Sequence, residues 1–110
     1  MPVVSNTSPL LNLSITGHLH LLPQQFERIW IPEAVLAELR LEESLPGSPA
    51  IRQAIQDGWL QVKPVQDTVF VQVLARELDR GEAEAIGLAI EMGASRVLLD
   101  EREGRRIAKG

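Results

Sequence analysis

The stretch VVSNTSPL, residues 3–10, predicts a strand that runs directly into a helix. Val3 and Val4 form a short apolar strand, and the polar side chains that follow are of the types that cap a helix start. Pro9 suits the first turn of a helix, because the N–H that proline lacks has no helical acceptor there. The stretch therefore indicates a strand–helix unit with Asn6 at the carboxyl end of the strand.

The same alternation of strand and helix continues along the chain. Apolar patterns predict strands over residues 26–31 and 96–99, and residues 59–62 are either a strand or an extended connector. The alternation predicts one α/β domain over residues 1–110, with a mainly parallel sheet covered by helices on both faces. Helices are expected over residues 10–16, around 18–22, over 32–39, 51–57, 67–78 and 82–92, and finally over 101–109.

The composition excludes several kinds of site. The chain has no cysteine, which excludes disulfides, thiolate metal ligands and cysteine nucleophiles and fits a cytoplasmic protein. No apolar run approaches the ~20 residues that a membrane span requires. The formal net charge of -4 argues against a general phosphate-binding surface. Binding of a nucleic acid would therefore require something local that offsets the acidic side chains.

Polar side chains are expected to meet at one edge of the predicted sheet. Asn6 follows the first strand and Asp100 follows the last, and ligand sites of parallel sheets form beyond the carboxyl ends of strands. Glu38, Glu82 and Glu84 lie on predicted helices that can lean over this edge. Oxygen ligands from several chain segments are what Mg²⁺ or Mn²⁺ requires. The sequence therefore indicates a divalent-metal site, which can activate a water and offset the charge of a phosphate.

Each of these side chains also has a simpler structural explanation. Residues 6–8 can serve only as caps of the first helix, and Asp100 can cap the last one. Glu38 can be a solvated helix residue. Glu82 and Glu84 stand in a first helical turn, where the helix dipole favours acidic side chains, and residues two apart point to different sides. At most one of these two is therefore expected to bind a metal.

Four segments resemble successive motifs of a known family. They are VVSNTSPL at residues 3–10, PEAVLAELR at 32–40, GEAEAIGLA at 81–89 and VLLDEREGRRIAKG at 97–110. Together they resemble the PIN domain family, in particular its short prokaryotic, VapC-like members. The resemblance implies a PIN-like three-layer sandwich with a small parallel sheet between helices. Because the family normally continues into another helix and a final strand, the last C-terminal elements are expected to be lacking.

The resemblance also implies an activity and the residues that carry it. Members of the family cleave single-stranded RNA with Mg²⁺ or Mn²⁺ held by four acidic positions, and many are toxins bound by a cognate antitoxin. Carried over, Asn6 occupies the first position, Glu38 the second, Glu82 or Glu84 the third and Asp100 the fourth. The expected metal ligands are therefore Asp100, Glu38, Glu84 and Asn6, with the choice between Glu82 and Glu84 left open.

Further expectations concern the substrate and partners. Thr7 or Ser8 matches the hydroxyl position that accompanies the first acidic position, and both are expected to contact the substrate together with Arg102. The family usually has Asp where this chain has Asn6, so the alternative is a PIN-like nucleic-acid-binding or protein-interaction domain with weakened catalysis. A homodimer is also expected. A phosphoacceptor domain is disfavoured by Asn6 and by the lack of a later strand-end Lys.

Overall fold

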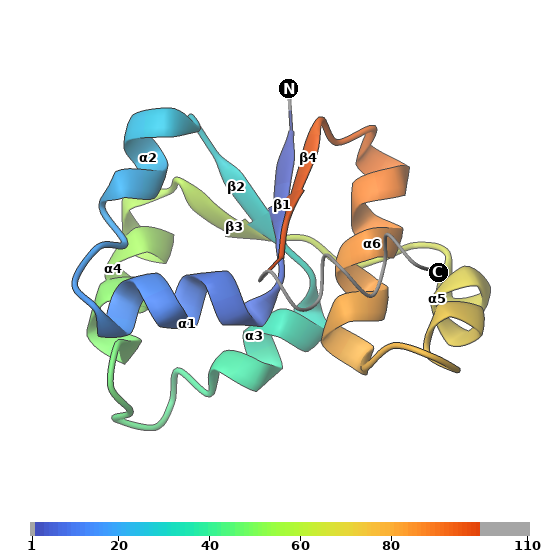
Figure 1. Ribbon diagram of the computed structural model, residues 1–110, viewed down its shortest axis with the longest axis horizontal. Helices are drawn as coiled ribbons and strands as arrows, with labels where there is room; N and C mark the ends of the chain where they lie inside the picture. The colour runs from blue at the N-terminus through green and yellow to red at the C-terminus, as the bar shows by residue number, and fades with distance from the viewer. Residues whose placement is uncertain (1, 100–110) are drawn as a thin grey trace.

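The computed structural model describes residues 2–99, which form a parallel sheet flanked by helices (Figure 1). The strands are β1 (Val3–Ser5), β2 (Ile29–Ile31), β3 (Leu60–Val62) and β4 (Arg96–Leu98). They lie in the order β3-β2-β1-β4, and every neighbouring pair is parallel. The prediction of an α/β fold with a mainly parallel sheet is confirmed.

The helices connect the strands in the order that the sequence pattern predicts. Between β1 and β2 the chain forms two helices, and between β2 and β3 it forms two more. A further two helices precede β4. The helices are α1 (Thr7–Ile15), α2 (Leu21–Gln25), α3 (Glu33–Leu39), α4 (Ser48–Asp57), α5 (Thr68–Leu74) and α6 (Arg80–Met92).

Two apolar clusters lie on opposite faces of the sheet. Successive side chains of a strand point to opposite faces, and the two buried valines of β1 follow this rule. Val3 belongs to the larger cluster with Leu10 of α1 and Ile51 of α4, whereas Val4 belongs to the smaller cluster with Leu88 of α6. The sheet is therefore the middle of three layers, with α1 and α4 on one face and α6 on the other (Figure 1).

The carboxyl ends of the strands meet where several helices begin. Figure 1 shows β1 leading into α1 at this edge, with α3 and the first turn of α6 beside it. Helix α3 packs against both α1 and α6. The edge that the sequence pattern singled out is thus bordered by three helices.

Several element boundaries differ from the predicted ones. In the predicted strand 26–31 only the last three residues pair, because the Phe26 N–H still bonds to the Leu22 carbonyl at the end of α2. The predicted helix 67–78 ends at Leu74 and continues as turns. Helix α6 begins before residue 82, because Asp79 caps it. The helical turn expected around residues 18–22 is displaced to α2, and the helix expected over 101–109 lies outside the described residues.

Residues 59–62, for which a strand and a connector were both open, contain a strand. Leu60–Val62 pairs with β2 in parallel register, and the Ile29 N–H extends the ladder to the Trp59 carbonyl. Within residues 2–99, the helices are too short or too polar to cross a membrane.

A substitution at Leu88 tests the smaller apolar cluster, which contains Val4 of β1. Leu88 is completely buried, whereas Ile90 on the same helix is 62% exposed. Leu88→Ala leaves a cavity under β1 and should lower the free energy of unfolding by about 2–5 kcal/mol in urea denaturation. Ile90→Ala is the matched control and should cost less than about 1 kcal/mol. Equal losses from the two substitutions would contradict this packing.

Candidate metal centre

Asn6 continues the sheet beyond the end of β1. Its backbone N–H donates to the Leu98 carbonyl at 2.9 Å, so the ladder between β1 and β4 extends one residue past Ser5. Asn6 is the N-cap residue of α1, but its side chain makes no capping hydrogen bond. Helix capping therefore does not account for the amide side chain at this position.

The Asn6 side chain is buried in an unusual way. The residue is 2% exposed, and its Oδ1 accepts no hydrogen bond from the part of the chain that the structure describes. A buried acceptor without a donor costs about 1–3 kcal/mol, so such an atom calls for a specific explanation. A cation at the carboxyl edge of the sheet would provide one, because an amide oxygen is a good ligand for a hard divalent ion.

Thr7 joins the start of α1 to α3. Its hydroxyl donates to Glu38 Oε2 at 2.8 Å, across 31 residues of sequence. Thr7 is buried and Ser8 is half-buried, whereas Glu38 as a residue is exposed. The hydroxyl therefore holds one oxygen of the Glu38 carboxylate, and Thr7 directly follows Asn6 in the chain.

The same carboxylate lies against the first turn of α6. A Cβ placed on Gly81 would overlap Glu38 Oε1 and would lie 2.9 Å from Glu38 Cδ. Only a residue without a side chain leaves room for the carboxylate in this orientation. An unbroken set of contacts therefore runs from β1 through Thr7 and Glu38 to the start of α6.

Glu82 follows Gly81 and is almost completely buried, with 1% exposure. It forms a capping box with Asp79: the Glu82 N–H donates to Asp79 Oδ1 at 2.8 Å, and the Asp79 N–H donates to Glu82 Oε1 at 3.4 Å. The capping box holds the Glu82 carboxyl group on the first turn of α6. This turn is the one that Glu38 contacts.

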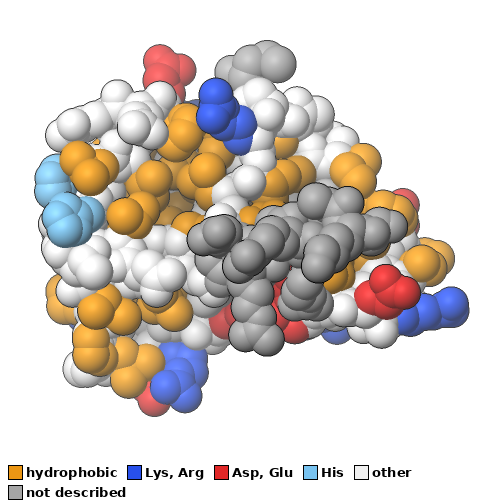
Figure 2. Space-filling model, in the orientation of Figure 1, with side chains coloured by type: hydrophobic (Ala, Val, Ile, Leu, Met, Phe, Trp, Pro, Cys, Tyr) orange, Lys and Arg blue, Asp and Glu red, His pale blue; other side chains and the backbone are white. Residues whose placement is uncertain are grey.

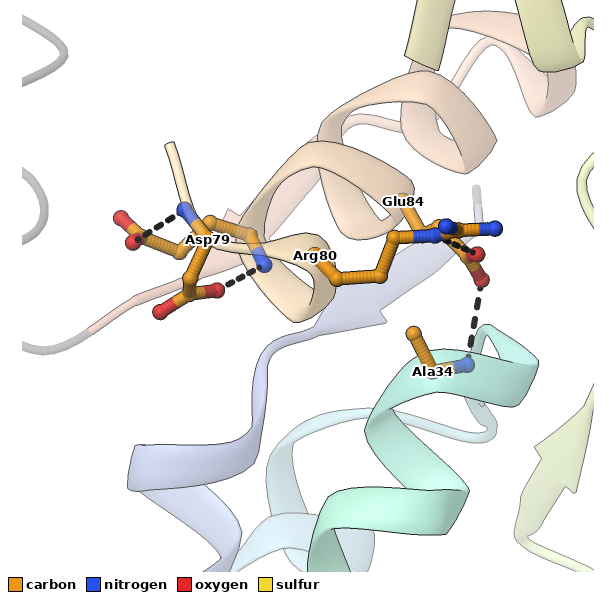
Figure 3. Close-up of polar contacts among 5 residues, drawn as sticks. Ala34, Asp79, Arg80 and Glu84 are labelled. Atoms are coloured by element: carbon orange, nitrogen blue, oxygen red, sulfur yellow. Dashed lines mark hydrogen bonds and ion pairs between the residues drawn. The ribbon is translucent and has the colours of Figure 1, made fainter. Parts of the chain in front are cut away.

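Glu84 points to another part of the α3–α6 contact, as expected for a residue two positions from Glu82. Its Oε1 accepts from the Ala34 N–H at 3.1 Å, and its Oε2 accepts from Arg80 Nε at 2.9 Å (Figure 3). The Glu84 side chain is 12% exposed. Both of its oxygens thus have protein donors.

The expected ligand Asp100 and the expected substrate contact Arg102 lie outside the described residues. The last register pair between β1 and β4 joins Ser5 to Leu98. Among residues 2–99, no three Asp, Glu, His or Cys side chains are grouped to hold a metal by themselves. The acidic side chains and histidines of residues 2–99 therefore do not form a metal site on their own.

Acidic side chains gather on the surface where α3 meets the start of α6 (Figure 2). The carboxylates that the described residues place here, those of Glu38 and Glu82, favour a cation and disfavour direct contact with a phosphate. A divalent ion at this place would reverse that preference.

Sequence reasoning missed two residues that shape this site. The pattern D-x-x-E over residues 79–82 is a capping-box signature, so the role of Asp79 could have been recognised. Gly81 opens the GEAEAIGLA segment, but its sequence context does not reveal its role. Its contact with Glu38 spans 43 residues, the difference between positions 81 and 38, and no local pattern signals it.

Comparison with known proteins identifies the family of the chain. A family model described as the PIN domain matches residues 2–110. No curated protein and no solved structure gives a significant match. PIN domains are generally nucleases and typically bind divalent metals, in keeping with the oxygen-rich edge described above. Because the match covers nearly the whole sequence, the chain belongs to the PIN domain family.

Proposed function

We propose that the protein is a divalent-metal-dependent ribonuclease that hydrolyses phosphodiester bonds of single-stranded RNA. The observation that carries the proposal is the buried Asn6 Oδ1, which lacks a hydrogen-bond donor among residues 2–99. It lies at the strand edge where Thr7 and Glu38 meet the first turn of α6. An amide oxygen without a donor among the described residues, on an edge that also carries carboxyl groups, suits Mg²⁺ or Mn²⁺.

The residues of the proposed site would have distinct roles. Glu38 and Asp100 would supply carboxylate ligands, and Asn6 would supply a neutral oxygen. We assign the third acidic position to Glu82 in place of Glu84, because Glu82 directly follows Gly81, the residue that lies against the Glu38 carboxylate. Thr7 would keep the Glu38 carboxylate oriented through its 2.8 Å hydrogen bond.

A bound divalent ion would activate a water for attack and offset the charge developing on the phosphate. The chain itself would position the groups around it and bring the phosphate to an edge that is otherwise acidic. Ser8 and Arg102 are proposed as substrate contacts, with Arg102 suited to a phosphate oxygen by its charge. Activity would then depend on the added metal, because the net charge of -4 repels RNA in its absence.

The proposal extends to the biological role and the partners of the protein. The motifs at residues 3–10 and 81–101 resemble those of VapC-like toxins. We therefore propose that the protein is the toxin of a toxin–antitoxin pair, that a cognate antitoxin binds it, and that it forms a homodimer.

A catalytically weakened PIN domain is the second candidate, and Asn6 is the observation that favours it. An amide in place of the usual carboxylate removes one negative charge from the metal site, which lowers the affinity for a divalent cation. Such a protein would keep its fold and would bind nucleic acid or protein without cutting RNA.

Cleavage of a single-stranded RNA in the presence of Mn²⁺ distinguishes the two candidates. The proposal expects cleavage by the wild type, none by Asp100→Ala or Glu82→Gln, and unchanged or faster cleavage by Asn6→Asp. Glu91→Gln is the control, because it removes a carboxylate near the other end of α6, where Glu91 binds the N–H groups of Gln66 and Asp67. It should cleave like the wild type.

The outcome that sinks the nuclease assignment is equal cleavage by highly purified wild type and Asp100→Ala, because the activity would then come from a contaminant. A wild type that binds Mn²⁺ or RNA but does not cleave would favour the weakened domain, and gain of cleavage in Asn6→Asp would identify the amide as the cause.

Gly81→Ala tests the contact between Glu38 and α6. Alanine is the better helix former by about 1 kcal/mol, so the free energy of unfolding should change by no more than about that amount. Its methyl group would push the Glu38 carboxylate away from Thr7, and Mn²⁺ affinity measured by calorimetry should fall about 10-fold. In a Glu38→Ala background the same substitution should have little further effect. Wild-type affinity in the single variant would refute this role of the contact.

A further inference from the structure

Glu84 links two helices that each carry an acidic residue of the site. Its carboxylate lies between the Ala34 N–H at the start of α3 and Arg80 on its own helix (Figure 3). The Glu84 side chain is 12% exposed, whereas that of Arg80 is 71% exposed. A carboxylate this buried needs strong partners, and a backbone N–H together with a guanidinium provides them.

The bond to Ala34 supplies α3 with a cap that its own sequence lacks. The first N–H groups of a helix have no acceptor within the helix. The N-cap residue of α3 is Pro32, which makes no side-chain capping bond, and the first helical bond runs from the Leu36 N–H to the Pro32 carbonyl. Glu84 therefore satisfies an otherwise open donor from 50 residues away.

The contact between the two helices has a second point. Ala34 and Glu38 are four residues apart and so lie on one side of α3. Ala34 meets Glu84, while Glu38 meets Gly81 three residues earlier on α6. The two contacts run in opposite directions along the helices, as in an antiparallel pair. Fixing the contact between Ala34 and Glu84 therefore restricts how far α3 can slide or turn where Glu38 meets Gly81.

From this geometry we infer that Glu84 is a positioning residue: it caps α3 from α6 and thereby holds Glu38 against Gly81, next to Glu82. The inference rests on the proposed metal-dependent function. It separates the two acids of the GEAEAI segment by role, with Glu82 at the metal and Glu84 holding the helix that carries Glu38. Arg80 completes the arrangement by offsetting the Glu84 charge on the solvent side.

The test compares Glu84→Gln with Glu84→Ala in two measurements on the folded protein. Glutamine keeps an oxygen that can accept from the Ala34 N–H, whereas alanine leaves that donor without a partner. Glu84→Ala should weaken Mn²⁺ binding about 10-fold without changing its stoichiometry, and Glu84→Gln should restore most of the affinity. Hydrogen exchange of the Ala34 amide, measured without metal, should become faster in Glu84→Ala and stay slow in Glu84→Gln.

Glu91 provides a matched control on the same helix. Its carboxylate also binds backbone N–H groups, those of Gln66 and Asp67, but it anchors the start of α5 and has no bond to α3. Glu91→Ala should therefore leave both Mn²⁺ affinity and exchange at Ala34 at wild-type values. If Glu91→Ala lost as much Mn²⁺ affinity as Glu84→Ala, general destabilisation would explain both losses, and the inference would be overturned.

Two further results would overturn the positioning role. If Glu84→Gln loses as much Mn²⁺ affinity as Glu84→Ala while Ala34 keeps slow exchange, Glu84 is a metal ligand. If Glu84→Ala binds Mn²⁺ like the wild type, Glu84 has no influence on the site. Should the wild type bind no Mn²⁺, the proposed function fails, and the exchange at Ala34 still decides whether Glu84 caps α3.

Discussion

The close packing of α6 against its neighbours is the constraint on which the rest of the structure depends. The buried side of this helix consists largely of small residues: Gly81, Ala83, Ala85, Gly87 and Ala89. They allow α6 to approach both the sheet and two other helices. A Cβ on Gly87 would lie only 3.0 Å from Val71 Cγ2 of α5, and one on Gly81 would overlap the Glu38 carboxylate of α3. Larger side chains would separate the helices and pull the acidic groups apart.

Carboxylates on α6 fasten this arrangement by accepting from backbone N–H groups. Glu82 binds the N–H of Asp79, Glu84 that of Ala34, and Glu91 those of Gln66 and Asp67. Each bond satisfies a donor near the start of a helix, where the helix dipole also favours negative charge. Three carboxylates of α6 therefore stabilise helix starts, and acidic residues at a family's site positions need not all be metal ligands.

The Asn6 side chain, in contrast to these carboxylates, accepts no hydrogen bond from the described residues. Asn6 contributes its backbone to the sheet ladder, its side chain does not cap α1, and its buried Oδ1 has no donor among the described residues. Within residues 2–99, this neutral oxygen at the strand edge therefore serves neither the sheet ladder nor the helix cap. A carboxylate there would bind a cation more strongly but would also repel the nearby acids when no cation is bound. In the proposed metal site, the amide would reduce that repulsion at the expense of metal affinity.

The sequence by itself determined the alternation of strands and helices, the parallel sheet and the position of Asn6 at a strand end. Periodicity, proline and glycine positions and capping residues act over a few residues, so these features can be read from the sequence. Only the tertiary structure decided that Glu38 meets Thr7 and Gly81 and that Glu84 caps α3. These contacts join residues 31 to 50 positions apart. They arise from how closely α6 packs, and that distance depends on side chains from several elements at once.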